Sequence, residues 1–147
     1  MADVTTHLSQ VQRLNLPVVL EMAHPARREP CFVALLRLAG DEALVSADLA
    51  ELAVSLSEIE RYWTKRALFP WPTASPLATA ASPNERQAVA RAALVRLGYD
   101  ASDPARALLR FQNETDLVPD GTIGPRTLLA LYALSERNRP ALVRGLP

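Results

Sequence analysis

The stretch from Leu117 to Leu134 reads LVPDGTIGPRTLLALYAL, and it decides the fold of the C-terminal half of the chain. Two prolines and two glycines form a short turn that runs directly into an apolar stripe with helical spacing. Asp120-Gly121 predicts a turn in which glycine takes a positive φ without a Cβ clash. Gly124-Pro125 predicts a close backbone approach followed by a preset helical φ. We therefore expect a rigid turn that opens a helix, with Ile123 pointing inward.

Two further helix starts precede this turn. Ser82-Pro83-Asn84-Glu85 supplies an N-cap, a proline at the first helical position and a reciprocal glutamate, and its helix is expected to end at Gly98. Asp103-Pro104 is the second start. The apolar faces of the three helices are expected at Val89, Ala93 and Leu97, at Leu108 and Phe111, and at Leu128, Leu131 and Tyr132. Residues 82–147 are therefore predicted to form a three-helix bundle.

The first 71 residues are mostly strand-like. Ser55 and Glu58 form a capping-box pattern for one helix, whose buried face would carry Ile59, Tyr62 and Trp63. Short apolar runs with turn signals between them predict strands at 17–23, 31–39, 42–47, 51–55 and 66–71. We expect a small antiparallel sheet with one packed helix. The chain as a whole is therefore predicted to belong to the α+β class.

A proline-rich stretch separates the two halves. Residues 69–83 read FPWPTASPLATAASP and hold four prolines, a composition that predicts neither a helix nor a central strand. We interpret residues 72–81 as a linker between a β-rich unit at 1–71 and a helical unit at 82–147.

The composition and charge of the chain argue against several classes of function. The formal net charge is zero, so nothing steers the molecule towards nucleic acid or an anionic membrane. No apolar run approaches the roughly 20 residues of a membrane span, and the start lacks the pattern of a signal peptide. Any segment that carries the protein out of the cytoplasm is expected outside this sequence. The one cysteine, Cys31, excludes an internal disulfide, and its apolar neighbours predict a buried thiol. We expect no metal and no cofactor.

The C-terminal half resembles a known family of cell-wall domains. LGYD at 97–100, FQ at 111–112 and DGTIGPRT at 120–127 occur in the order found in the peptidoglycan-binding domain of the type called PG-binding 1. That family is a three-helix unit appended to cell-wall hydrolases, transpeptidases and secretion proteins. Its members usually carry a first copy of the turn between LGY and FQ, where this chain has only ASDPARA.

The resemblance implies a groove that binds peptidoglycan beside the turn. Muropeptides offer acetamido sugars, amides and carboxylates, which suit backbone amides, hydroxyls, carboxamides and an arginine. Gln112 and Arg126 are expected at the surface of their helices, and the Thr127 hydroxyl against free backbone amides. The predicted binding residues are Gln112, Asp120, Gly121, Thr122, Gly124, Arg126 and Thr127. For the glycines, Pro125 and Ile123 we favour the alternative of a purely structural joint.

The N-terminal half is similar to the C-terminal half of papain-like peptidases of the C39 type. The match covers LNLPVVLEM and then residues 31–71. Cys31 stands where that family has its catalytic histidine, and Phe32 stands where a tyrosine is expected. Asp48 falls near the family's aspartate but has no imidazole to orient. We therefore expect no enzyme activity and no catalytic residue.

Together the two resemblances match the periplasmic tail of the general secretion pathway protein A family, also called ExeA. They imply a periplasmic module that engages peptidoglycan and helps to assemble the secretin channel with a B-type partner. Two alternatives stay open. One is an accessory domain of a cell-wall amidase, peptidase or transpeptidase. The other is a protein-interaction module that has lost glycan binding and docks a partner or a second copy of the chain, which the shortened first half-site favours.

Overall fold

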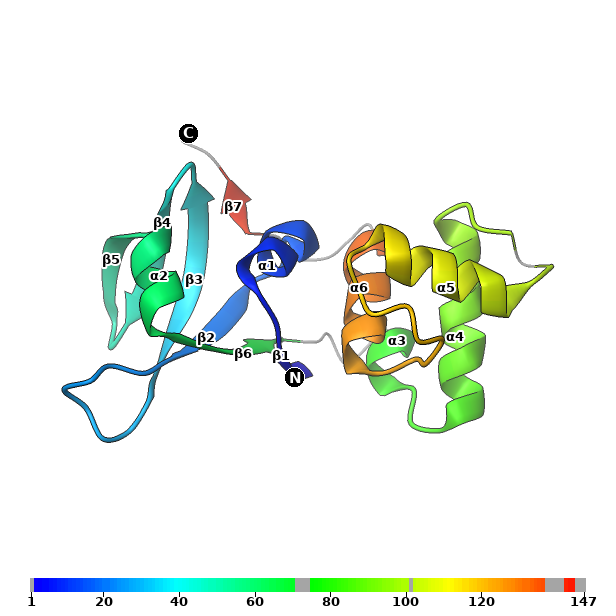
Figure 1. The fold of residues 1–147 in the computed structure, drawn as a ribbon, viewed down its shortest axis with the longest axis horizontal. Coiled ribbons are helices and arrows are strands. Elements are labelled where there is room, and N and C mark those ends of the chain that lie inside the picture. Colours follow the sequence, from blue (N-terminus) through cyan, green and yellow to red (C-terminus); the bar gives the residue numbers. More distant parts are fainter. Residues whose placement is uncertain (1, 71–74, 101, 137–141, 145–147) are drawn as a thin grey trace. The chain divides into compact units, whose positions relative to one another are not determined.

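The computed structural model describes residues 2–70, 75–100, 102–136 and 142–144 of the 147. Its contacts divide the chain into two units. Unit 1 comprises Met1–Pro70 with Pro140–Pro147, and unit 2 comprises Trp71–Arg139. Unit 1 holds a β-sheet and unit 2 is helical, which confirms the predicted α+β class (Figure 1).

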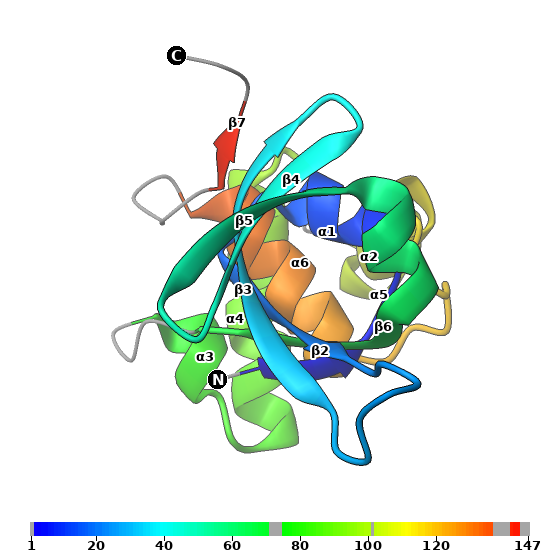
Figure 2. The same ribbon diagram turned by 90° about the vertical axis from the view of Figure 1, so that its left-hand side faces the viewer.

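The sheet of unit 1 follows the order β1-β6-β2-β3-β4-β5, and neighbours along this order are antiparallel. A further short strand, β7, pairs with β3 in parallel. The strands are β1 (Ala2–Thr5), β2 (Val18–Met22), β3 (Cys31–Ala39), β4 (Glu42–Ala47), β5 (Ala50–Ser55), β6 (Trp63–Phe69) and β7 (Val143–Arg144). The sheet is strongly twisted (Figure 2).

The described part of unit 1 carries two helices rather than the single predicted one. Helix α1 (Leu8–Leu14) follows β1 and buries Val11 and Leu14. Helix α2 (Leu56–Tyr62) begins as predicted, with the Ser55 Oγ accepting from the Glu58 amide at 3.1 Å. Trp63 is buried, but it is the first residue of β6 and not part of the helix.

The hairpin between β4 and β5 turns on two residues in the left-handed region. Asp48 and Leu49 have φ values of 49° and 67°, which is the pattern of a type I′ hairpin turn. Aspartate tolerates this region, but leucine does so at a cost. Because Leu49 is fully exposed, no packing contact offsets that cost. Asp48 is therefore suited to the geometry of this turn, whereas Leu49 is not.

The end of the described chain lies with the sheet and not with the helices. Val143 pairs with Arg37 of β3, and the Leu142 amide donates to the Asn15 carbonyl. The sequence assigned these residues to the helical unit, because a two-residue strand has no periodicity of its own. In chain order, unit 2 is an insertion between β6 and β7.

Unit 2 contains α3 (Pro76–Thr79), α4 (Pro83–Arg96), α5 (Pro104–Glu114) and α6 (Pro125–Ser135). The three predicted helix starts are confirmed: Ser82 and Asp103 cap α4 and α5, and Gly124 precedes Pro125 of α6. Helix α3 was not expected, since it lies in the stretch interpreted as a linker. Its proline occupies the first turn, where no amide is needed, and Leu77 is buried. Residues 71–74 of the predicted linker lie outside the described part of the chain.

The core of unit 2 centres on α6, which packs against α3 and α4. Its residues from Thr127 to Ala133 are all buried, as expected for a helix that is apolar on every side. Leu108 and Phe111 of α5 are buried as predicted. On α4, Ala93 is buried as predicted, but Val89 and Leu97 are only half-buried, and Ala90 and Leu94 complete the buried face instead. No helix in the described part of the chain is long and apolar enough to span a membrane.

Candidate functional site

Gln112 organises the predicted turn from inside the protein. Its side chain is 1% exposed, so the expectation of a surface position was wrong. Its Nε2 lies 2.9 Å from the Thr122 carbonyl, 3.1 Å from the Thr127 Oγ1 and 3.2 Å from the Asp120 Oδ1. Its Oε1 accepts from the Gly121 amide at 3.0 Å. The carboxamide thus satisfies the turn's own polar groups, as a buried polar side chain must.

The two glycines of the turn differ. Gly121 has a φ of 74°, which confirms the predicted positive φ. Gly124 has an ordinary φ of −92°, and a Cβ added there would meet nothing within 4 Å. The predicted close approach at Gly124 was therefore wrong. The helix start needs the φ of Pro125 and not the small size of the residue before it.

The remaining predicted binding residues differ in how far they are exposed to solvent. Thr127 is buried, and its hydroxyl accepts from Gln112 instead of meeting backbone amides. Asp120 and Thr122 are exposed, and the Thr122 amide donates to the Asp120 Oδ1 at 2.9 Å. Hydrogen bonds from Thr122, assisted by one from Gln112, hold the pKa of Asp120 below its usual value of 3.8. Arg126 is exposed at the first turn of α6.

Tyr99 of the LGY sequence fastens the end of α4 to α5. Its hydroxyl bonds the Glu114 carboxylate, and its ring meets Phe111 edge-on with centroids 5.9 Å apart. Arg110 also donates to Glu114, at 2.9 Å. Burial and then the Glu114 bond raise the pKa of Tyr99 to about 12. Gly98, with a φ of 93°, ends α4 as predicted and turns the chain so that Tyr99 reaches Phe111 and Glu114.

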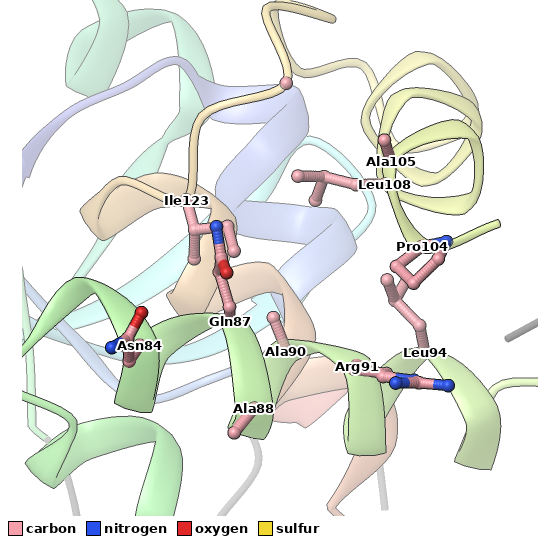
Figure 3. A pocket seen from close by; sticks show the side chains of 11 residues that line it. Asn84, Gln87, Ala88, Ala90, Arg91, Leu94, Pro104, Ala105, Leu108 and Ile123 are labelled. Atoms are coloured by element: carbon pink, nitrogen blue, oxygen red, sulfur yellow. The ribbon is translucent and has the colours of Figure 1, made fainter.

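A hollow of about 530 Å³ lies between α4, α5 and the loop that precedes α6. Figure 3 shows the side chains of α4 along one wall and those of Pro104, Ala105 and Leu108 beyond them, with Ile123 above. The base is apolar and buried, formed by Ala90, Leu94 and Leu108, while the rim is exposed. The full lining is Asn84, Gln87, Ala88, Ala90, Arg91, Leu94, Pro104, Ala105, Leu108, Gly121 and Ile123.

Sequence reasoning missed this hollow almost entirely. Of the predicted binding residues only Gly121 lines it, together with the half-buried Ile123. The polar rim residues Asn84, Gln87 and Arg91 look in the sequence like an ordinary solvated helix face. Their spacing of three and four positions does place them on one side of α4. That spacing is the one signal from which the rim could have been recognised.

Unit 1 contains the chain's one thiol, Cys31, and its two imidazoles, His7 and His24. Cys31 opens β3 and is half-buried, so the predicted buried thiol is only partly enclosed. The His24 Nδ1 accepts from the Ala26 amide, and its ring lies against Tyr62 with centroids 5.0 Å apart. The His7 Nδ1 is bonded to the Ser9 hydroxyl. Among the described residues, no group of three or more His, Cys, Asp or Glu could hold a metal ion.

The fold, a twisted sheet with a helical insertion, has a counterpart among solved structures. It is similar to the crystal structure of a periplasmic domain of the EpsAB fusion protein of the Vibrio vulnificus type II secretion system. The TM-score is 0.50 at 18% identity, and the match covers 94% of this chain. The chain spans 65% of the length of that structure. No family model and no curated protein sequence matches the chain.

Proposed function

We propose that the chain is a non-catalytic, peptidoglycan-binding module of the periplasm that assists assembly of a type II secretion channel through the cell wall. The observation that carries the proposal is the hollow between α4 and α5. Its rim presents two carboxamides and a guanidinium, and its base is apolar. Such a lining suits the acetamido groups, peptide amides and carboxylates of peptidoglycan.

The likeness to the EpsAB periplasmic domain supports the secretion context and the periplasmic location. A secretin, or a B-type partner protein that works with it, is the expected assembly partner. The module would hold these components against the cell wall by binding peptidoglycan through unit 2. The sheet of unit 1 would then supply a scaffold and no chemistry, as the resemblance to C39-type peptidases implies, in which Cys31 stands at the position of the catalytic histidine.

Co-sedimentation with purified sacculi tests the peptidoglycan interaction. Ala105 lines the hollow and is exposed, so Ala105→Phe should fill the space without disturbing the core. We expect the parent protein to sediment with sacculi and Ala105→Phe to remain in the supernatant. Ala92→Phe, at an exposed position of α4 outside the hollow, is the matched control and should sediment like the parent. In cells, Ala105→Phe should lower the amount of assembled secretin multimer.

A protein-docking function is the second candidate. It is favoured by Gln112 and Thr127, whose polar groups are engaged inside the turn instead of facing a ligand. If the parent protein stays in the supernatant with sacculi at moderate salt, the peptidoglycan proposal fails. Capture of the purified secretin or B-type partner under the same conditions would then favour docking.

A further inference from the structure

The polar residues of the hollow form a row. Asn84, Gln87 and Arg91 share one face of α4 and extend over about 10 Å, given the 1.5 Å rise per residue of a helix. All three are exposed. Two neutral carboxamides come first and the guanidinium comes last. A ligand that follows this row meets groups that donate and accept, and then a cation.

The rest of the hollow accepts small apolar groups. Ala88, Ala90 and Ala105 leave room for methyl-sized substituents, and Leu94 and Leu108 provide an apolar base. Among the described residues that line the hollow, none is aromatic and none is acidic. The lining therefore offers no flat aromatic ring on which a sugar could stack. It also offers no carboxylate to repel an anion.

An extended peptide fits this arrangement. Such a chain advances about 3.3 Å per residue, so the row on α4 matches about three residues. Carboxamides at the first two positions can bond peptide N–H and C=O groups. A guanidinium at the end matches a terminal carboxylate, which it can bind through two parallel bonds. Side chains of methyl size would then lie on the alanines.

We propose that the hollow binds the carboxyl-terminal end of a short peptide with small aliphatic side chains, and that Arg91 pairs with its terminal carboxylate. The inference rests on the proposed function, because it assigns the peptide stems of peptidoglycan, and not its glycan strands, to this site. The glycan contributes by presenting many stems on one polymer.

A peptide titration tests the assignment. Acetyl-Lys-D-Ala-D-Ala and its C-terminal amide are titrated into the isotope-labelled full chain, and the backbone amide shifts of α4 are followed by NMR. We expect the free acid to bind at least tenfold more tightly than the amide. Arg91→Gln should abolish this preference. Arg106→Gln, an exposed arginine on α5 outside the hollow, should retain it. Equal affinities for acid and amide, or an unchanged preference in Arg91→Gln, would overturn the inference.

Co-sedimentation with two preparations of sacculi distinguishes this inference from the proposed function. One preparation is intact, and the other has been stripped of its peptide stems by an amidase. We expect the parent protein to sediment with the intact sacculi, and retention on the stripped ones to fall at least tenfold. Equal retention on both overturns the peptide assignment and leaves peptidoglycan binding in place. Retention on neither overturns the proposed function, and the comparison of acid with amide then decides the peptide assignment alone.

Discussion

Gln112 and Thr127 lie 15 positions apart, and a 3.1 Å hydrogen bond between their side chains ties α5 to the first turn of α6. The same carboxamide accepts from the Gly121 amide, so one side chain fixes both ends of the turn. In an apolar surrounding, such groups must be bonded to one another or remain unsatisfied. The DGxxGP turn is therefore rigid because a glutamine from another helix completes its hydrogen bonds.

Removal of the Gln112 carboxamide should destabilise unit 2. Gln112→Met keeps the length of the side chain but leaves the Gly121 amide and the Thr127 hydroxyl without their partner, at a cost of about 1–3 kcal/mol. Urea unfolding followed by circular dichroism measures the loss. Arg126→Met makes the same replacement at an exposed site and should leave the midpoint unchanged. Equal midpoints for the two variants would contradict the internal role of Gln112.

The two glycines of the turn should respond in opposite directions. Gly121→Ala forces a Cβ into the left-handed region and should cost about 1–2 kcal/mol. Gly124→Ser places a preferred N-cap side chain at an open position with an ordinary φ, and should hold or slightly raise the stability. Thermal unfolding of the two variants beside the parent provides the comparison. Damage by Gly124→Ser as large as that by Gly121→Ala would show that position 124 does require a glycine.

Asp120 should make the turn sensitive to acid. Because its pKa is lowered in the folded state, its contribution to stability is present above the usual value of 3.8. That contribution is lost as the pH falls through the lowered pKa. We expect the stability difference between the parent and Asp120→Asn to shrink as the pH falls below about 4. Chemical unfolding at a series of pH values tests this, and a difference that stays constant with pH would argue against it.

Trp63 should be indispensable to unit 1. It is buried at the start of β6, and its Nε1 donates to the Arg66 carbonyl at 2.9 Å. Trp63→Ala should cost about 3–5 kcal/mol, which is enough to unfold a small unit. The exposed Arg28→Ala serves as the control. Loss of the strand signal and of amide dispersion in NMR spectra is the expected readout, and native spectra for Trp63→Ala would refute the prediction.

Leu49 offers a stabilising change. A fully exposed leucine in the left-handed region gains nothing from packing, so Leu49→Gly should stabilise the β4–β5 hairpin by about 1 kcal/mol. The expected result is a higher unfolding midpoint in urea. An unchanged or lower midpoint would mean that Leu49 contributes something that its exposure does not reveal.

Helix starts and most strands could be predicted from the sequence because their signals are local. Ser55, Ser82 and Asp103 each cap a helix with the expected side-chain bond. Helix α1 escaped notice because its N-cap, His7, makes no capping bond and its seven residues complete barely two turns. β7 was missed because its existence depends on β3, more than a hundred positions earlier. Local patterns carry no information about such pairings.

The site was harder to predict for the same reason. The motif residues could be recognised, but not the direction of their side chains. Gln112 points inward because the turn folds back over α5 and offers it four partners. The hollow exists only when α5 and the loop at Ile123 face the row on α4. Tertiary placement converts an ordinary polar helix face into one wall of a cleft.

The insertion of unit 2 between β6 and β7 has a mechanical consequence. β1 and β7, near the two ends of the chain, both belong to the sheet of unit 1. A pulling force applied to the two ends is therefore carried across the sheet and bypasses the helices. Only when the two-residue strand β7 detaches from β3 does the load reach unit 2. The pairing of β7 with β3 therefore shields unit 2 from a force applied to the two ends for as long as that pairing lasts.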